Sequence, residues 1–170
     1  PVGYWRMGED ATFNGTNLLL PDYSKKALFS QQSFEFDGVD DYIDCGSITE
    51  FASTLTKFSM SFWYKTSVTG NMPISIYNGI YIVVESTRIQ IWISGTRTDF
   101  TTPLLDDTWR SAILVYDGTE STSVDRVKLY AAGSVLSPTT ISDPLPTTTT
   151  AIPTPTLRIG NYYTSSAYCW

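Results

Sequence analysis

Four aspartates in one short stretch are the residues of this chain whose type and spacing come nearest to a metal site. Asp37, Asp40, Asp41 and Asp44 lie within eight consecutive residues around a glycine. Calcium takes six to eight oxygen ligands, and closely spaced aspartates on a turn could supply two or three of them. Backbone carbonyls or a distant residue such as Asn161 would have to supply the others. The alternative is plain turn chemistry, because aspartate carboxylates readily accept backbone N–H groups at turns.

Aromatic residues are the second candidate for chemistry, because sugars present apolar C–H faces that stack on rings. Trp63 and Trp92 lie in segments where apolar and polar residues alternate, and their same-face neighbours are polar. Both rings are therefore predicted to point outward from a sheet and to bind glycan. The alternative is that both rings pack under loops. Trp109 opens an expected strand and is predicted to lie in the core.

The chain has two cysteines, Cys45 and Cys169, which could form one disulfide. A bridge requires Cα atoms within ~7 Å of each other, which the sequence cannot establish. The alternative is two unpaired thiols. Two cysteines without any histidine exclude a zinc site of the usual kind.

Several functional classes are disfavoured by composition. The chain has no histidine, which removes serine–histidine–aspartate triads and the commonest general base. A net charge of −6 argues against a protein that binds the phosphate backbone of nucleic acid. No apolar run reaches the ~18 residues of a membrane span. We therefore expect no enzyme, no nucleic-acid partner and no membrane span.

The elements that would position these residues are almost all strands. Phe34 and Phe36 alternate with polar residues, and Asp37-Gly38 is typical of a tight turn before a second strand that Gly46 ends, so a surface hairpin is predicted. Asn78-Gly79 predicts another two-residue hairpin turn. Further strands are expected at Tyr4–Met7, Ala27–Ser30, Phe58–Lys65, Pro73–Tyr77, Ile80–Glu85, Arg88–Ser94, Trp109–Tyr116, Asp125–Ala131 and Leu157–Gly160.

Three segments between these strands are predicted to be irregular. Residues Asp10–Ser24 are expected to form a long polar insertion. Ile48–Leu55 could make a turn or two of helix. Ser137–Thr156 is rich in proline and threonine, so it is expected to be an extended loop or an edge-covering segment. Strands at regular spacing with turn residues between them predict an all-β, antiparallel two-sheet sandwich.

Several of these segments resemble, in the same order, the motifs of the laminin-G-like, concanavalin A-like jelly-roll family. The aspartate-rich stretch is similar to that family's FDGxDDYV hairpin. The likeness spans roughly residues 4–170 and includes the segments Tyr4–Glu9, Phe58–Lys65, Trp109–Gly118, Val127–Gly133 and Leu157–Gly160. The resemblance implies one jelly-roll domain over residues 1–170. It further implies a binding rim in the final loop, with Tyr162, Tyr163 and Tyr168 as glycan-binding candidates.

Two departures from the family pattern qualify this resemblance. The chain stops near Trp170, where the family's last strand would begin, and it does not start with methionine. We therefore expect a piece of a longer polypeptide that lacks its last strand. The family's glycosidases carry a Glu-x-Asp-x-x-Glu set on one strand, and no expected strand has it here, since Glu85 stands alone and Glu35 faces Asp37 only across a turn.

The resemblance and the composition together predict a non-enzymatic adhesion or recognition module. Its expected ligand is a cell-surface glycan, and its expected setting is extracellular or the surface of a virion, on a cell-surface or phage fibre protein. The alternative is a structural assembly or decoration module with protein partners, because an exposed sheet edge invites strand addition. No cofactor is expected apart from calcium at the aspartates.

Overall fold

The computed structural model describes residues 12–13, 18–19, 33–101, 107–131 and 133–161. It divides the chain into two compact units, Pro1–Glu35 and Phe36–Trp170, and each is described by itself. In the first unit, β1 (Thr12–Phe13) and β2 (Leu18–Leu19) pair antiparallel, within the segment expected to be a polar insertion. The prediction of one domain over the whole chain stays a prediction.

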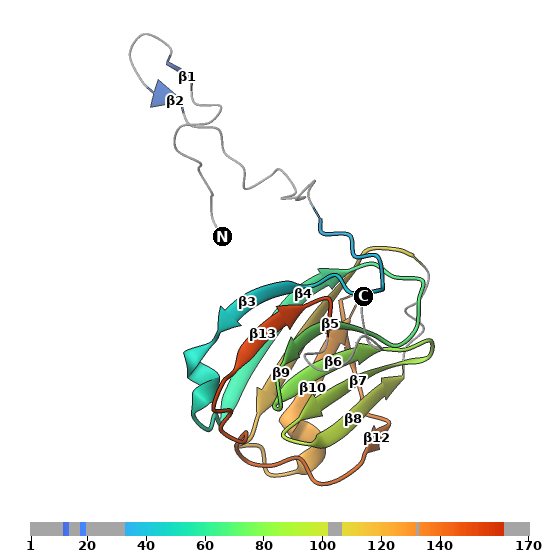
Figure 1. Cartoon of the computed structure of the whole chain (residues 1–170). Helices are drawn as coiled ribbons and strands as arrows, with labels where there is room; N and C mark the ends of the chain where they lie inside the picture. The colour runs from blue at the N-terminus through green and yellow to red at the C-terminus, as the bar shows by residue number, and fades with distance from the viewer. Residues whose placement is uncertain (1–11, 14–17, 20–32, 102–106, 132, 162–170) are drawn as a thin grey trace. The chain divides into compact units, whose positions relative to one another are not determined.

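The second unit is a sandwich of two antiparallel sheets (Figure 1). The smaller sheet has the order β11–β10–β9–β4, formed by Ser134–Leu136, Val127–Ala131, Arg110–Asp117 and Lys57–Tyr64. The larger sheet has the order β12–β8–β7–β6–β5–β13–β3, formed by Thr140–Ile141, Thr96–Thr101, Arg88–Ile93, Ile80–Val84, Asn71–Ile76, Thr156–Ile159 and Ile43–Ser47. The predicted all-β, two-sheet sandwich is confirmed.

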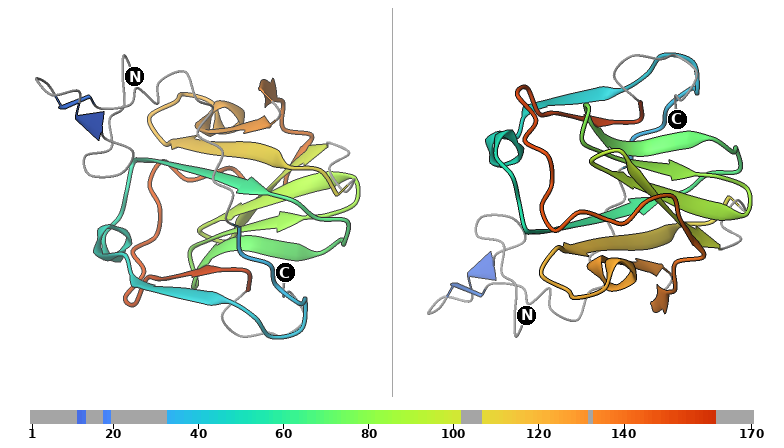
Figure 2. Two further views of the ribbon diagram at one scale, coloured as in Figure 1. Left: turned by 90° about the horizontal axis from the view of Figure 1, so that it is seen from above. Right: turned by 90° about the horizontal axis from the view of Figure 1, so that it is seen from below.

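Alternation along each strand explains why these two sheets pack face to face. On β7, Ile89, Ile91 and Ile93 are fully buried, and their cross-strand neighbours on β6 and β8 include Val84 and Phe100, also fully buried. On the other sheet, the inward residues of β9 and β10 are equally buried. The two layers enclose this core (Figure 2). Burial of apolar area between them is the main force that holds the sandwich together.

The predicted hairpin around Gly38 is only half correct. Its second strand exists as β3, but residues 33–42 form no strand, and Phe34 is exposed. β3 pairs instead with β13, far along the chain. Phe36 packs its ring on Gly160, where a Cβ atom would lie 2.7 Å from Phe36 Cε1. A long-range strand pairing therefore replaces the local one that the turn residues favoured.

The central meander is confirmed, with one change in its turn. Ile76 pairs with Ile80, so the loop has three residues, Tyr77, Asn78 and Gly79. Asn78 takes the positive φ of 58°. Gly79 is needed for a different reason, because a Cβ atom there would lie 1.9 Å from Ile152 Cδ1. The close approach of the proline- and threonine-rich segment thus shapes this turn.

That proline- and threonine-rich segment does more than cover an edge. Short β12 pairs with β8 at the edge of the larger sheet, as an edge-covering segment would. Further along, Leu145 and Ile152 are buried in the core between the sheets. The Tyr116 hydroxyl donates to the carbonyl of Pro146 at 2.7 Å, and burial raises the pKa of that hydroxyl. The segment therefore closes one side of the core.

Two short 3-10 helices complete the described structure, η1 (Thr49–Ala52) and η2 (Ser123–Arg126). The first lies in the segment expected to make a helical turn. In the described residues, no helix is long and apolar enough to cross a membrane. The predicted strands at Tyr4–Met7 and Ala27–Ser30 lie outside the described residues.

Candidate functional site

Trp63 is the most exposed large aromatic ring of the smaller sheet. It lies on β4, where Phe58, Met60 and Phe62 face the core and the intervening residues face outward, as predicted. Its side chain is 66% exposed. Among the residues that the structure describes, its ring has no aromatic, ionic or hydrogen-bond partner, and its cross-strand neighbour is the small residue Ser111. The prediction that Trp63 points outward is confirmed, and its role in glycan binding stays a prediction.

Trp109 is also exposed, so its predicted place in the core is wrong. It directly precedes β9 and is 53% exposed. The physical reason is the period of two along β9, because Ala112, Leu114 and Tyr116 occupy the inner face. Counting back in twos from Ser111 places Trp109 on the outer face instead. This parity was readable from the sequence and would have given the correct side.

Trp63 and Trp109 belong to one end of the smaller sheet. The pairing of β4 with β9 is extended by a backbone hydrogen bond from Asp107 N to Thr66 O, 3.2 Å long. On the outer side of this end, Lys65 Nζ lies 3.6 Å from Asp107 Oδ2. We call this group the tryptophan surface; its members are Trp63, Lys65, Asp107, Trp109 and Ser111. It combines two exposed rings with a hydroxyl and two opposite charges.

The outer face of the smaller sheet continues with further apolar side chains. One cross-strand row runs from Ser61 through Ile113 and Tyr130 to Val135. The last three are exposed large hydrophobic residues. This row is therefore apolar on three of the four strands, whereas β4 contributes a serine to it.

Trp92 lies on the outer face of the larger sheet, as predicted, but both sides of its ring are flanked. A cross-strand row places it between Tyr81 on β6 and Arg97 on β8. The Tyr81 and Trp92 rings are stacked, with centroids 5.2 Å apart and planes at 17°, and Arg97 Cζ lies 5.9 Å from the Trp92 centroid. Its Nε1 donates to Gln90 Oε1 at 3.2 Å. This ring is thus much less free to stack on a ligand than Trp63.

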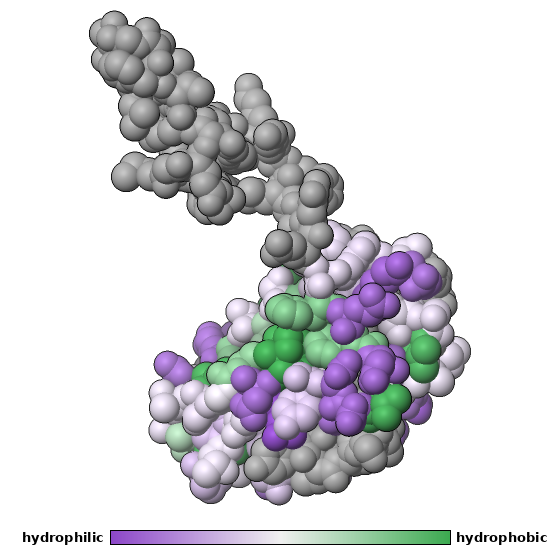
Figure 3. Space-filling view, turned by 45° about the horizontal axis from the view of Figure 1, so that its top comes forward, coloured by the Kyte–Doolittle hydropathy of each residue, from purple (hydrophilic) through white to green (hydrophobic). Residues whose placement is uncertain are grey.

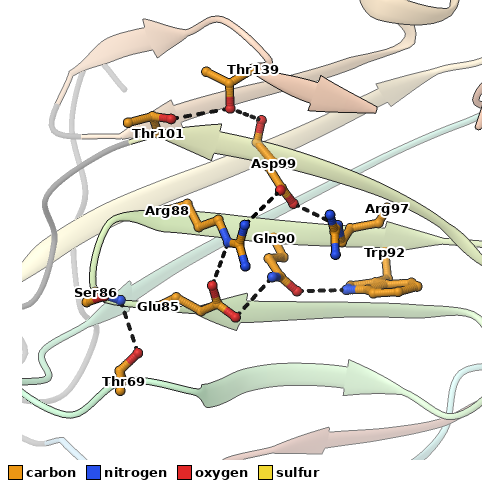
Figure 4. Close-up of polar contacts among 10 residues, drawn as sticks. All are labelled: Thr69, Glu85, Ser86, Arg88, Gln90, Trp92, Arg97, Asp99, Thr101 and Thr139. Carbon is orange, nitrogen blue, oxygen red and sulfur yellow. Dashed lines mark hydrogen bonds and ion pairs between the residues drawn. The ribbon is translucent and has the colours of Figure 1, made fainter. Parts of the chain in front are cut away.

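Charged side chains near Trp92 pair with one another (Figure 4). Arg88 Nε donates to Glu85 Oε2 at 2.5 Å, and Arg88 Nη1 donates to Asp99 Oδ2 at 3.3 Å. Gln90 Nε2 donates to Glu85 Oε1 at 3.0 Å. Arg97 Nε lies 3.1 Å from Asp99 Oδ1. We call Glu85, Arg88, Gln90, Arg97 and Asp99 the polar network, and Figure 3 shows hydrophilic and apolar side chains side by side on this face.

The sequence reasoning missed this network because its members come from three strands. Glu85 was expected to stand alone, yet it is bound by both Arg88 and Gln90. The hydrogen bond that Glu85 accepts from Arg88 raises the pKa of the Arg88 guanidinium. All four carboxylate oxygens of Glu85 and Asp99 face a nitrogen of the network, so neither acid is placed as a free general acid or base. Only the register that pairs Gln90 with Asp99 brings these residues together, and the sequence does not give that register.

The aspartate cluster is brought together in part. Carboxylate oxygens of Asp37, Asp40 and Asp41 lie within 4.8 Å of one another, and all three residues are exposed. Val39 N donates to Asp37 Oδ1 at 2.8 Å, and Asp37 N donates to Asp41 Oδ2 at 3.3 Å. In these bonds aspartate carboxylates accept backbone N–H groups, as the alternative of plain turn chemistry expects. Calcium binding stays a prediction.

Asp44 belongs to a different group from the other three aspartates. Its Oδ1 accepts from Gly46 N at 2.8 Å, and its Oδ2 lies 3.6 Å from Arg158 Nη2. The Arg158 guanidinium also lies 4.3 Å from the centroid of the Tyr42 ring. This arrangement ties β3 to β13 and is structural.

The remaining predicted site residues are not brought to a described site. Cys45 lies exposed on β3, and Cys169 lies outside the described residues, so their pairing stays a prediction. Tyr162, Tyr163 and Tyr168 also lie outside the described residues. The proposed tyrosine rim is therefore not part of the geometry above.

Comparison with solved structures finds chains similar to this one. No family model matches the chain, and no curated protein matches its sequence. The chain is similar to a solved structure of the mouse laminin alpha1 chain, domains LG4-5, with 13% sequence identity and a TM-score of 0.48. The likeness covers 64% of this chain and 29% of that chain, so this chain spans less than a third of its length.

Proposed function

We propose that this chain is a non-enzymatic recognition module that binds a glycan at the tryptophan surface. The observation that carries the proposal is the Trp63 ring, which is 66% exposed on a rigid strand and has no partner among the described residues. Large aromatic side chains usually bury most of their area. A ring held in solvent on a β-strand is available to stack on the apolar face of a sugar.

The neighbours of Trp63 support a sugar more than a purely apolar ligand. Ser111 lies directly across from it on β9, and the Lys65–Asp107 ion pair lies at the same end of the sheet. A hydroxyl, an ammonium and a carboxylate offer donors and acceptors to sugar hydroxyls. Trp109 adds a second ring beside them. The proposed setting is an adhesion protein outside the cell or on a virion.

A non-enzymatic role is supported by the state of the acidic groups on the other face. Glu85 and Asp99 are held by arginines and a glutamine rather than aimed at an open cleft. Glycoside hydrolysis needs two carboxyl groups with separate acid and base roles. A pair of acids neutralised by the same arginine does not meet that need.

The proposal is tested on a glycan array with the full chain, with and without calcium. The affinity for glycan should fall by about tenfold or more in the Trp63→Ala variant, because a central aromatic contact is truncated. Trp92→Ala is the matched control, since it removes the flanked ring of the other sheet and should leave glycan affinity unchanged. Glycan binding that survives Trp63→Ala, or no binding to any glycan, would contradict the proposal.

The second candidate function is a structural assembly or decoration module with protein partners. It is favoured by β4, which is an edge strand of the smaller sheet and pairs with β9 alone within the described residues. If the array shows no glycan binding while the chain associates stably with a virion or fibre protein, this function replaces the first.

A further inference from the structure

The outer edge of β4 has little of the protection that natural sheets usually give their edges, since its one charge is Lys57 at its first position. β4 has eight residues, and it pairs with β9 without a break in register from Lys57↔Asp117 to Tyr64↔Arg110. From Phe58 to Trp63 it contains no charge, no proline and no bulge. Proteins normally blunt an exposed edge with one of these features. Within the described part of the chain, no strand covers this edge.

The inner face of β4 shows the consequence of that open edge. Phe58, Met60 and Phe62 point toward the core but are only half-buried. On the neighbouring strand β9, the inward residues Leu114 and Tyr116 are fully buried. The inward side chains of β4 are therefore less buried than those of β9, with the exception of Tyr64 at its end, which is 2% exposed. Covering these side chains would release water from apolar surface and stabilise the covered state.

From these observations we propose that a second copy of this chain binds this edge, by antiparallel pairing of β4 with β4 of the partner copy. Side chains alternate with a period of two, so only registers that keep inner faces together are allowed. A register centred on Met60 pairs it with itself and pairs Phe58 with Phe62 of the other copy. All inner contacts are then apolar, and Ser59 meets Ser61 on the outer side.

Charge complementarity selects this register over the next one. Centred on Met60, the pairing sets Lys57, whose Nζ is bonded to Asp117 Oδ2 of its own copy at 2.9 Å, opposite Trp63 of the other copy, so no like charges face each other. Centred on Ser61, it would set Lys57 opposite Lys65, and like charges directly opposite each other destabilise a sheet. The Met60-centred register therefore joins apolar inner faces without opposing like charges. The two smaller sheets would join into one continuous sheet.

The test is the mass of the full chain by sedimentation velocity across a dilution series. A dimer that dissociates on dilution is expected. The double variant Ser59→Lys/Ser61→Lys places the introduced lysines against each other at the centre of the interface. Both serines point to solvent, so the fold should be retained, and the dimer dissociation constant should rise by at least about tenfold. The double variant Ser121→Lys/Ser134→Lys adds the same charge at exposed sites away from β4 and should leave the dimer intact.

Hydrogen exchange of the unmodified chain gives a second reading that needs no variant. Alternate backbone amides between Phe58 and Phe62 should gain protection as the concentration rises. A chain that is monomeric at every concentration would overturn the proposal. A dimer dissociation constant that is unchanged in Ser59→Lys/Ser61→Lys would also overturn it. So would an equal loss of the dimer in the control variant Ser121→Lys/Ser134→Lys. None of these readouts involves a glycan, so they are independent of the proposed binding function.

Discussion

On the larger sheet, Trp92 lies between Tyr81 and Arg97 within a network of paired charges, whereas on the smaller sheet Trp63 faces solvent beside a serine. Both tryptophans sit on outward positions of regular strands. The difference comes from the strands on either side. Trp92 is on a central strand with a long side chain across from it on each flank, but β4 is an edge strand with one short neighbour at that position.

This contrast separates a face whose side chains pair with one another from the face on which we propose that a ligand binds. Glu85, Arg88 and Gln90 hydrogen-bond within the polar network, and Asp99, its central acid, is only 3% exposed. The tryptophan surface leaves its rings without partners among the described residues.

The largest effect is expected from Asp99→Asn. The change removes the charge that both Arg88 and Arg97 face, at 3.3 and 3.1 Å, on a side chain that is nearly buried. The free energy of unfolding should fall by about 2 to 3 kcal/mol, measured by chemical denaturation. Asp107→Asn breaks the exposed Lys65 ion pair on the other face and should cost less than about 1 kcal/mol. Equal losses in the two variants would remove the distinction between the faces.

The second effect compares the two rings directly. Trp92→Ala removes a stacked contact and a hydrogen bond to Gln90, and should lower the free energy of unfolding by about 1 to 2 kcal/mol. Trp63→Ala removes an exposed ring and should change it by less than about 0.5 kcal/mol. Thermal or chemical unfolding of the two variants measures this difference. The comparison fails if Trp63→Ala proves the more destabilising of the two.

The smallest effect is a pH dependence at the far end of the smaller sheet. A hydrogen bond from the Thr119 hydroxyl, with another from Lys57, lowers the pKa of Asp117 from 3.8 to about 2. Because the ionised form is favoured in the folded state, its stabilising contribution is full above pH 4 or so and is lost as the pH falls toward 2. The unfolding midpoints of the native chain and Asp117→Asn should therefore converge over that window. A constant difference down to pH 2 would contradict the assignment.

Much of the fold was predictable because it depends on local alternation. The period of two in Phe58–Lys65 and Arg88–Ser94 placed each side chain on its correct face, and the sandwich follows from several such strands. The expected first strand of the hairpin, at Phe34–Phe36, was wrong because turn residues report only local preference. β3 pairs with β13 instead, and the Asp44–Arg158 ion pair links the two strands.

The candidate site was less predictable than the fold. Trp63 and Trp92 were both expected on outer faces, and both are. The polar network was missed because Glu85, Arg88 and Asp99 lie on a strand end and two neighbouring strands, and only the register of β7 with β8 brings them together. Trp109 was misplaced although its parity with Ser111 was visible in the sequence.

Alternation along the sequence was enough to place residues on one side of a strand or the other, because backbone geometry sets successive side chains on opposite faces. The sequence was also enough to show that histidine, the commonest general base, is absent from these 170 residues. Only the tertiary structure decided which outward ring is covered and which is open. That outcome depends on the side chains that neighbouring strands place across from it, and strand order is settled by packing over the whole core.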